Sequence, residues 1–278
     1  MLIACYPALA WWHSTIDDNP DFAAKNVKPA ASHAIANAVT LINREVKKHG
    51  WSANAPWFSP TALLDDMPNY QKGILSGLTR FSTELRDHIG HNATEPDSNL
   101  AGAVEMLRYP PDKWVWPTSD SQYRAAAKNL REYNRQLAAG DVVFDRSAQT
   151  LRHVLDSFAA DLDASSAVIE THLAKSSGWP FDGLSDDIFY SVKGRLYAEF
   201  ILLKGLEIDY AAVIAQHGLA KPWASMMESL RAAIALRPWI VLNGAPGGSV
   251  FACTLCGQGF YLLRARAQLR QIEDILPP

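Results

Sequence analysis

The chain has 278 residues, enough for one large domain or two modest ones with a substantial core. Apolar residues make up 48% and charged residues 20%, a balance typical of globular proteins that excludes an intrinsically disordered chain. The formal net charge is -3 and no basic run exceeds Lys47–Lys48, so the basic footprint that nucleic-acid binding requires is missing. We expect a folded protein that does not bind nucleic acid.

Residues 1–12 (MLIACYPALAWW) are strongly apolar. A membrane-spanning helix needs about 20 apolar residues, so residues 1–13 are interpreted as the C-terminal part of a membrane anchor or signal segment whose beginning is missing. Trp11 and Trp12 would lie at the lipid headgroups, where amphipathic aromatic side chains concentrate. No Lys or Arg follows before Lys25, so the positive-inside rule predicts that residues 14–278 lie on the translocated side of the membrane.

Two other interpretations of this apolar segment stay open. The residues LIAC, which end at Cys5, look like a lipoprotein cleavage box, and Cys5 would then be a lipidated N-terminus outside the cytoplasm. A short apolar helix that packs on the folded body also fits the composition.

The rest of the chain shows helical periodicity almost throughout. Ser32 is placed to cap the first helix, Gly50 and Gly140 to end two others, and Ser119 with Gln122 to form a capping box. Apolar spacing of three and four residues after Asp145 predicts the seam of a helical hairpin or a short coiled coil. The predicted helices cover about 32–50, 69–89, 100–108, 119–139, 145–175, 185–218, 222–237 and 249–276.

No alternation of period two persists long enough to predict a strand. The predicted fold is therefore all-α, with about seven long helices packed as antiparallel hairpins or a bundle. The sequence SSGWP within residues 176–184 breaks the helical pattern and is the best candidate for an internal boundary. We otherwise expect residues 14–278 to form one helical domain.

Three cysteines do not make a disulfide framework for a chain of this size. Cys253 and Cys256 have CxxC spacing, but no second pair and no nearby His would complete a zinc site. The preferred interpretation is two small residues that pack on one helix face. An oxidised pair in an oxidising compartment is the alternative.

Two further patterns are considered as ligand sites. Glu84, His88 and His91 have helical spacing that can share a metal, but no fourth ligand is evident and a solvated helix end is the preferred interpretation. The glycine-rich residues 243–248 precede a helix, as a phosphate-binding loop does, yet they lack the Gly-Lys-Ser/Thr signature and a preceding strand. A turn between helices is favoured there. We predict neither a metal nor a cofactor.

Glu199, Glu207 and Asp209 stand in an otherwise apolar helix near Arg195 and Lys204. Such carboxylates can serve acid–base chemistry or a dimetal site, but the Glu-x-x-His motif of dimetal bundles is absent. Ion pairs between helices are the favoured interpretation. The chain also has no Gly-x-Ser-x-Gly elbow and no Cys in a protease context, so we assign no catalytic residue.

Three stretches resemble a known bacterial family, the domain of unknown function 2333. They are residues 64–70 (LDDMPNY), residues 116–123 (WPTSDSQY), and a C-terminal part from residues 187–190 (DIFY) through 205–210 (GLEIDY) and 242–244 (LNG) to Arg264. The resemblance runs from about Trp11 to Leu276. It implies an N-terminal membrane helix followed by a helical extracytoplasmic body, and it implies no activity.

We therefore expect a non-enzymatic module anchored in the bacterial inner membrane by a single pass, with its body in the periplasm and a protein partner in the cell envelope. The alternative is a small-ligand binder or an enzyme whose site lies among polar residues of the resembling motifs. These residues are Asp65, Asp66, Asn69, Tyr190, Arg195, Asn243 and Arg264. Binding of a lipid or a peptidoglycan fragment between helices, by the nine Trp and nine Tyr residues, is a third possibility.

Overall fold

The computed structural model describes residues 16–55, 66–90, 97–175, 183–238 and 254–277. Within these ranges it contains nine α-helices, eight of them of seven or more residues, and no strand. The helices are α2 (His33–Asn43), α3 (Asp66–Glu84), α4 (Ser98–Leu107), α5 (Ser119–Ala139), α6 (Ala148–Lys175), α7 (Gly183–Asp209), α8 (Ala211–Gln216), α9 (Ala220–Ile234) and α10 (Thr254–Ile275). Short π-helical turns, Arg44–Lys48 and Leu85–Ile89, continue α2 and α3. The all-α prediction is confirmed.

No helix in the described ranges combines the length and apolarity that a membrane crossing needs. The predicted anchor, residues 1–13, lies outside these ranges, as do residues 176–182 of the predicted break.

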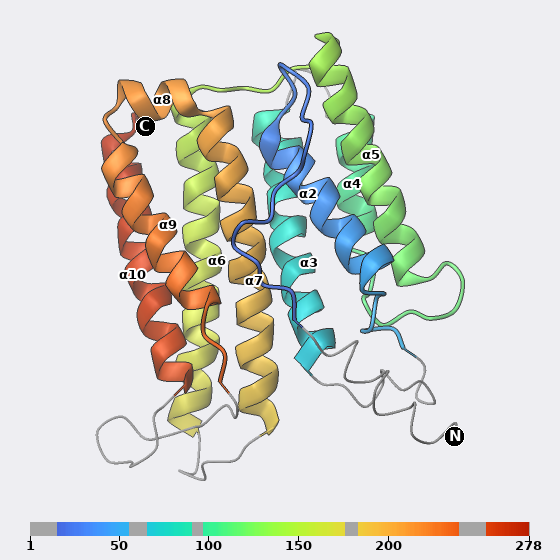
Figure 1. Ribbon diagram of the computed structural model, residues 1–278, viewed down its shortest axis with the longest axis vertical. Helices are drawn as coiled ribbons and strands as arrows, with labels where there is room; N and C mark the ends of the chain where they lie inside the picture. The colour runs from blue at the N-terminus through green and yellow to red at the C-terminus, as the bar shows by residue number, and fades with distance from the viewer. Residues whose placement is uncertain (1–15, 56–65, 91–96, 176–182, 239–253, 278) are drawn as a thin grey trace.

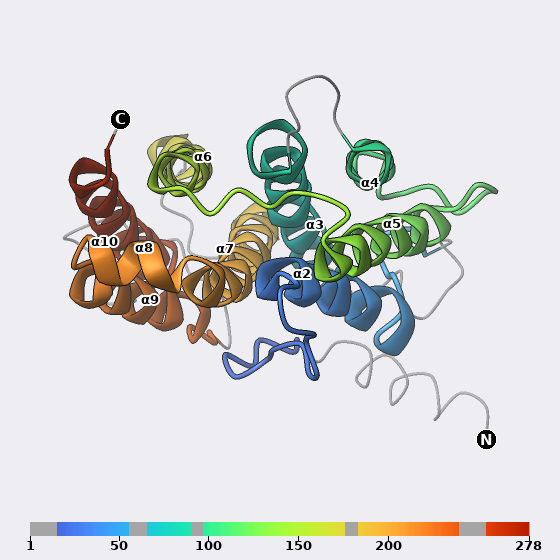
Figure 2. The same cartoon turned by 90° about the horizontal axis from the view of Figure 1, so that it is seen from above.

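Helix α7 lies in the middle of the molecule, with α2, α3, α4 and α5 on one side and α6, α9 and α10 on the other (Figures 1 and 2). Helix α7 packs on α3, α2 and α9. On one side of it, α10 packs on α6 and α9. On the other side, α5 packs on α4 and α2. A single cluster of buried apolar side chains runs from α2 to α10. The long apolar stretch of α7 is therefore explained by burial on several sides.

Local signals placed several helix ends correctly. The hydroxyl of Ser32 accepts the N–H of Ile35 at 3.1 Å and caps α2, and Gly140 ends α5 with a left-handed φ of 82°. The predicted capping box at Ser119 is wrong, because Thr118 is the N-cap of α5. Ser119 is the first helical residue, and its hydroxyl instead donates to the carbonyl oxygen of Pro110 at 2.7 Å. This hydrogen bond holds the loop before α5 in place.

The carboxylate of Asp209, at the end of α7, meets the first turn of α2. Its Oδ2 accepts the hydroxyl of Ser32 at 2.6 Å and the N–H of Ala34 at 3.0 Å, and its Oδ1 accepts the N–H of His33 at 2.8 Å. A negative charge that accepts free N–H groups stabilises a helix N-terminus. Asp209 thus joins two helices by capping, and the imidazole Nδ1 of His33 lies 3.3 Å from the same carboxylate.

The first described segment, residues 16–31, crosses α7 and α2 on the outside of the bundle (Figures 1 and 2). The Lys193 ammonium lies 2.8 Å from the Asp18 carboxylate, and Arg237 contacts the same carboxylate. Lys204 donates to the carbonyl oxygen of Pro20 at 2.7 Å, so it fastens this segment and pairs with no carboxylate of α7 in the described structure. Charged side chains of α7 therefore hold an otherwise irregular segment in place.

Candidate functional site

Four of the seven predicted site residues lie near the contact between α3 and α7. The Asn69 amide donates to Asp187 at 2.6 Å, and Asp66 hydrogen-bonds to Tyr190. Burial raises the pKa of Tyr190 far above its usual value, and the nearby charges of Asp66 and Asp186 raise it further. The phenol is therefore a neutral hydrogen-bonding group at physiological pH.

A pocket of about 240 Å³ opens beside this contact, between α6 and α7. Asn69 and Arg195 both line it, together with Asp187 and the hydroxyl-bearing Ser165 and Ser191. The guanidinium of Arg195 donates to the Ser165 hydroxyl at 3.1 Å. Two residues that are far apart in the sequence thus share one small cavity.

Asp66 and Tyr190 lie near this pocket but are not among the residues that line it. Arg264 is exposed on α10 and is not among the residues that line this pocket. Asp65 and Asn243 lie outside the described residues, as does the glycine-rich stretch 243–248. Only some of the polar residues of the resembling motifs therefore lie together, near the contact between α3 and α7.

A buried carboxyl group, that of Glu199, lies one helical turn beyond Arg195 on α7. Glu199 of α7 is 1% exposed, and burial raises its pKa well above the usual value, with the charge of Asp161 acting in the same direction. Arg80 donates to Asp161 through two nitrogens, at 2.9 and 3.1 Å. Three buried atoms, Glu199 Oε1, Asp161 Oδ2 and Arg195 Nε, have no hydrogen-bond partner in the described structure. Sequence patterns did not single out Asp161 and Arg80, because only the packing of α3 on α6 brings them together.

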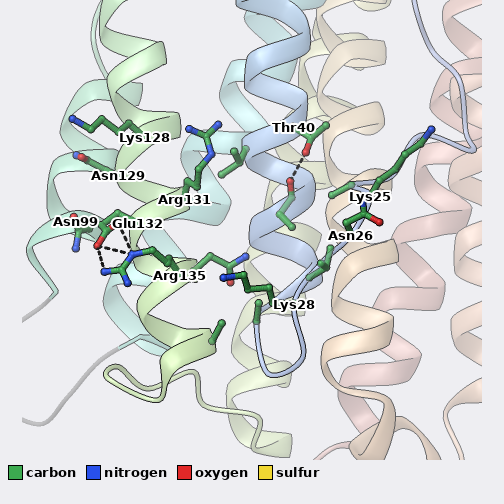
Figure 3. Close-up of a pocket in the computed structure, with 17 residues that line it drawn as sticks. Lys25, Asn26, Lys28, Thr40, Asn99, Lys128, Asn129, Arg131, Glu132 and Arg135 are labelled. Carbon is green, nitrogen blue, oxygen red and sulfur yellow. Dashed lines mark hydrogen bonds and ion pairs between the residues drawn. The ribbon is translucent and has the colours of Figure 1, made fainter.

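A larger cavity lies elsewhere, between α2, α5 and residues 24–31, and has a volume of about 730 Å³ (Figure 3). Its floor is made of small apolar side chains, among them Ala31, Ala36, Val39 and Ala138. Its rim carries five cations, Lys25, Lys28, Lys128, Arg131 and Arg135, and one carboxylate, Glu132. We call this cavity the basic groove.

Most of the positive charge in the basic groove is uncompensated. Glu132 pairs with Arg135 at 2.6 Å. Lys25, Lys28, Lys128 and Arg131 are exposed and form no ion pair with a carboxylate in the described ranges. In Figure 3, Lys28 reaches toward α5, which carries Lys128, Arg131 and Arg135. A chain with net charge -3 thus concentrates positive charge at one hollow of its surface.

The wall formed by residues 24–31 has a defined shape. Asn26 and Ala30 adopt left-handed φ values of 56° and 67°, which are costly for residues other than glycine. The side chain of Asn37 accepts the N–H of Ala24 at 2.8 Å, and that of Asn134 accepts the N–H of Ser32 at 2.8 Å. Both ends of the wall are therefore tied to the helices that it faces.

Two weak signals in the sequence point to this groove. The cations at positions 128, 131 and 135 share one helix face, and Lys25 and Lys28 are close in sequence. Because the two groups are about a hundred residues apart and each is interspersed with neutral residues, a search for basic runs does not find them.

The residues considered as metal ligands, and the cysteines, are described only in part. His88 lies 3.9 Å from Glu84, and its ring stacks on that of His153, while His91 lies outside the described residues. No group of three potential metal ligands occurs within the described ranges. Cys256 is disulfide-bonded, and the two other cysteines, Cys5 and Cys253, also lie outside these ranges.

Comparison with known families identifies a match over most of the chain. The bacterial family described as "Uncharacterized protein conserved in bacteria", the domain of unknown function 2333, matches residues 14–177 and 159–277. No curated protein and no solved structure is significantly similar to the chain. The two matched segments together span nearly the whole chain, so the protein belongs to this family.

Proposed function

We propose that the protein is a non-enzymatic binding module of the bacterial cell envelope, and that its basic groove holds an acidic segment of a partner protein. The observation that carries this proposal is the set of five cations around an apolar floor. An acidic amphipathic segment would place its apolar side chains on that floor and its carboxylates against the rim.

The spacing of the cations favours a chain over a compact anion. Lys128, Arg131 and Arg135 follow one face of α5 over about two helical turns, which corresponds to roughly 10 Å along the axis. A single phosphate or carboxylate cannot reach cations spread over this distance. Carboxylates distributed along a peptide can.

The proposed location is the inner membrane, with residues 1–13 as a single-pass anchor and the helical body in the periplasm. Three observations support it: the apolar character of residues 1–12, the absence of Lys or Arg before Lys25, and the disulfide at Cys256. Disulfides persist mainly in oxidising compartments.

The first test is a binding measurement on the full chain. The probe is a fluorescent peptide with Glu and Leu at amphipathic helical spacing, and a peptide with Lys in place of Glu is its counterpart. We expect saturable binding of the acidic peptide only, weakened by salt, and a loss of roughly tenfold or more in the Lys128→Glu/Arg131→Glu variant.

The matched control is Lys221→Glu/Arg264→Glu, which changes the net charge equally at exposed positions of α9 and α10. An equal loss of peptide affinity in both variants would mean that binding depends only on the net charge of the protein, which would contradict the proposal. In cells, a photoreactive amino acid in place of Asn129 should crosslink to acidic peptides, and one in place of the exposed Gln271 on α10 should not.

A second candidate function is small-ligand binding at the pocket lined by Asn69 and Arg195. It is favoured by the unpartnered Arg195 Nε and by the cavity of about 240 Å³. The guanidinium suits a small carboxylate-bearing ligand. A thermal-shift screen of small carboxylates would test it: stabilisation that Arg195→Gln abolishes supports this site, and stabilisation that persists in the variant rejects it.

A further inference from the structure

The loop between α4 and α5 exposes three consecutive large apolar residues. Trp114 and Val115 are each 61% exposed, and Trp116 is 85% exposed. Figures 1 and 2 show this loop projecting from the edge of the molecule that lies farthest from α9 and α10. Single exposed apolar residues are common, but three in a row at a projecting tip are not.

The base of the loop is firmly held. The hydroxyl of Ser119 accepts the N–H of Lys113 at 2.9 Å, and the hydroxyl of Tyr109 donates to the carbonyl oxygen of Pro117 at 2.9 Å. The indole of Trp51 donates to the carbonyl oxygen of Pro111 at 2.8 Å. Each of these contacts fixes a different point of the backbone around the tip.

This rigidity makes the exposure a property of the fold. Burying a large apolar side chain is worth about 1.5–3 kcal/mol, so a loose loop would fold its tryptophans back onto the protein. Here the hydrogen bonds of Ser119, Tyr109 and Trp51 keep the backbone from doing so. The tip is therefore arranged in advance to bury its side chains in something outside the molecule.

We propose that Trp114, Val115 and Trp116 insert into the interfacial region of a lipid bilayer. The tip projects from the molecule, and its three residues line neither the basic groove nor the pocket beside Asn69, so its shape suits insertion into a soft medium. Indole rings favour the headgroup region because they combine an apolar body with a polar N–H group. Lys113 adjoins the tip, where its ammonium can pair with lipid phosphates.

This surface is distinct from the basic groove, which is hollow and cationic. Its three residues line no part of that groove. A membrane-bound tip would orient the body of the protein at the lipid surface, whatever the groove binds. Either proposal can therefore fail while the other stands.

The test is flotation of the full chain with vesicles of phosphatidylethanolamine and phosphatidylglycerol. We expect Trp114→Ala/Trp116→Ala to lower the vesicle affinity by roughly tenfold for each indole removed. The matched control is Phe260→Ala, which removes a 60% exposed aromatic ring from α10 and should leave the affinity unchanged. All variants keep residues 1–15, so any membrane binding by that segment is common to them.

A second measurement reports on the tip itself. With vesicles that carry brominated acyl chains, part of the tryptophan fluorescence should be quenched, and Trp114→Phe/Trp116→Phe should remove that part while flotation is largely kept. Unchanged flotation of the Ala variant together with unquenched tip tryptophans would overturn the proposal. So would loss of self-association in the Ala variant without any lipid effect, since the tip would then contact a second copy.

Discussion

Gly73 of α3 and Gly194 of α7 each lie against the backbone of the other's helix. A Cβ atom at Gly73 would be 2.0 Å from the carbonyl oxygen of Ser191, and one at Gly194 would be 2.0 Å from that of Tyr70. Both distances are far below any real contact, so the two helices meet at backbone distance. This close crossing brings Asn69 within hydrogen-bonding distance of α7.

We expect Gly194→Ala to lower the free energy of unfolding by about 3 kcal/mol, because the added methyl group forces the helices apart. Urea denaturation followed by circular dichroism measures this. The control is Gly257→Ala in α10, where a Cβ would meet no atom within 4 Å. That substitution should stabilise the protein by up to about 1 kcal/mol. Similar effects of the two variants would show that the crossing tolerates a side chain.

Asp209→Ala should destabilise the protein by about 2–3 kcal/mol, since three donors at the start of α2, two of them buried, lose a charged acceptor. Hydrogen exchange should also become faster in the first turn of α2. The control is Glu207→Ala, an exposed carboxylate two residues earlier on the same helix, which should change the stability little. An equally small effect at Asp209 would contradict its role as a cap.

Glu199 should make the folded protein less stable as the pH rises. Because burial raises the pKa of Glu199 in the folded state, the folded protein binds its proton more tightly than the unfolded chain. The resulting stability is fully present below about pH 4.3, the pKa of an unperturbed Glu. It is lost as the pH rises from there to the raised pKa. Glu199→Gln should remove this decline, which chemical denaturation across a pH series detects, and Glu207→Gln should not.

Asp18 should make the folded protein less stable as the pH falls. Burial tends to raise the pKa of Asp18, but hydrogen bonds and charges from Arg237 and Lys193 outweigh it and lower the pKa. The stability from this carboxylate is therefore present above about pH 3.9 and lost as the pH falls through the lowered value. Asp18→Asn should cost about 3 kcal/mol at neutral pH, because it leaves Lys193 buried without its anion. Acid unfolding monitored by circular dichroism should then be less steep, and Asp21→Asn, exposed nearby, should leave it unchanged.

Helices and their ends were largely predictable, because their signals are local. Apolar spacing identifies α6 and α7, and Ser32 and Gly140 mark ends that the structure confirms. Ser119 shows the limit of such signals. Its neighbours fit a capping box, but its hydroxyl has better partners in the preceding loop, and Thr118 takes the cap position.

The candidate sites were less predictable, because they depend on which helices pack together. The resembling motifs led to Asn69 and Arg195, which do share a pocket. Lys28 and Lys128 both line the basic groove. No periodicity within residues 24–31 or within α5 relates the two positions. Asp209 likewise has an ordinary helical context, and only the fold shows that it caps α2.

The Asn134 side chain binds both the N–H and the carbonyl oxygen of Ser32, so α5 holds the chain at the point where α7, through Asp209, also holds it. Three helices thus share one anchoring point at the end of the groove wall. If a partner binds in the groove, the backbone of residues 24–31 is already ordered. Little of the binding free energy is then spent on ordering it. We therefore expect recognition there to be selective for shape as well as charge.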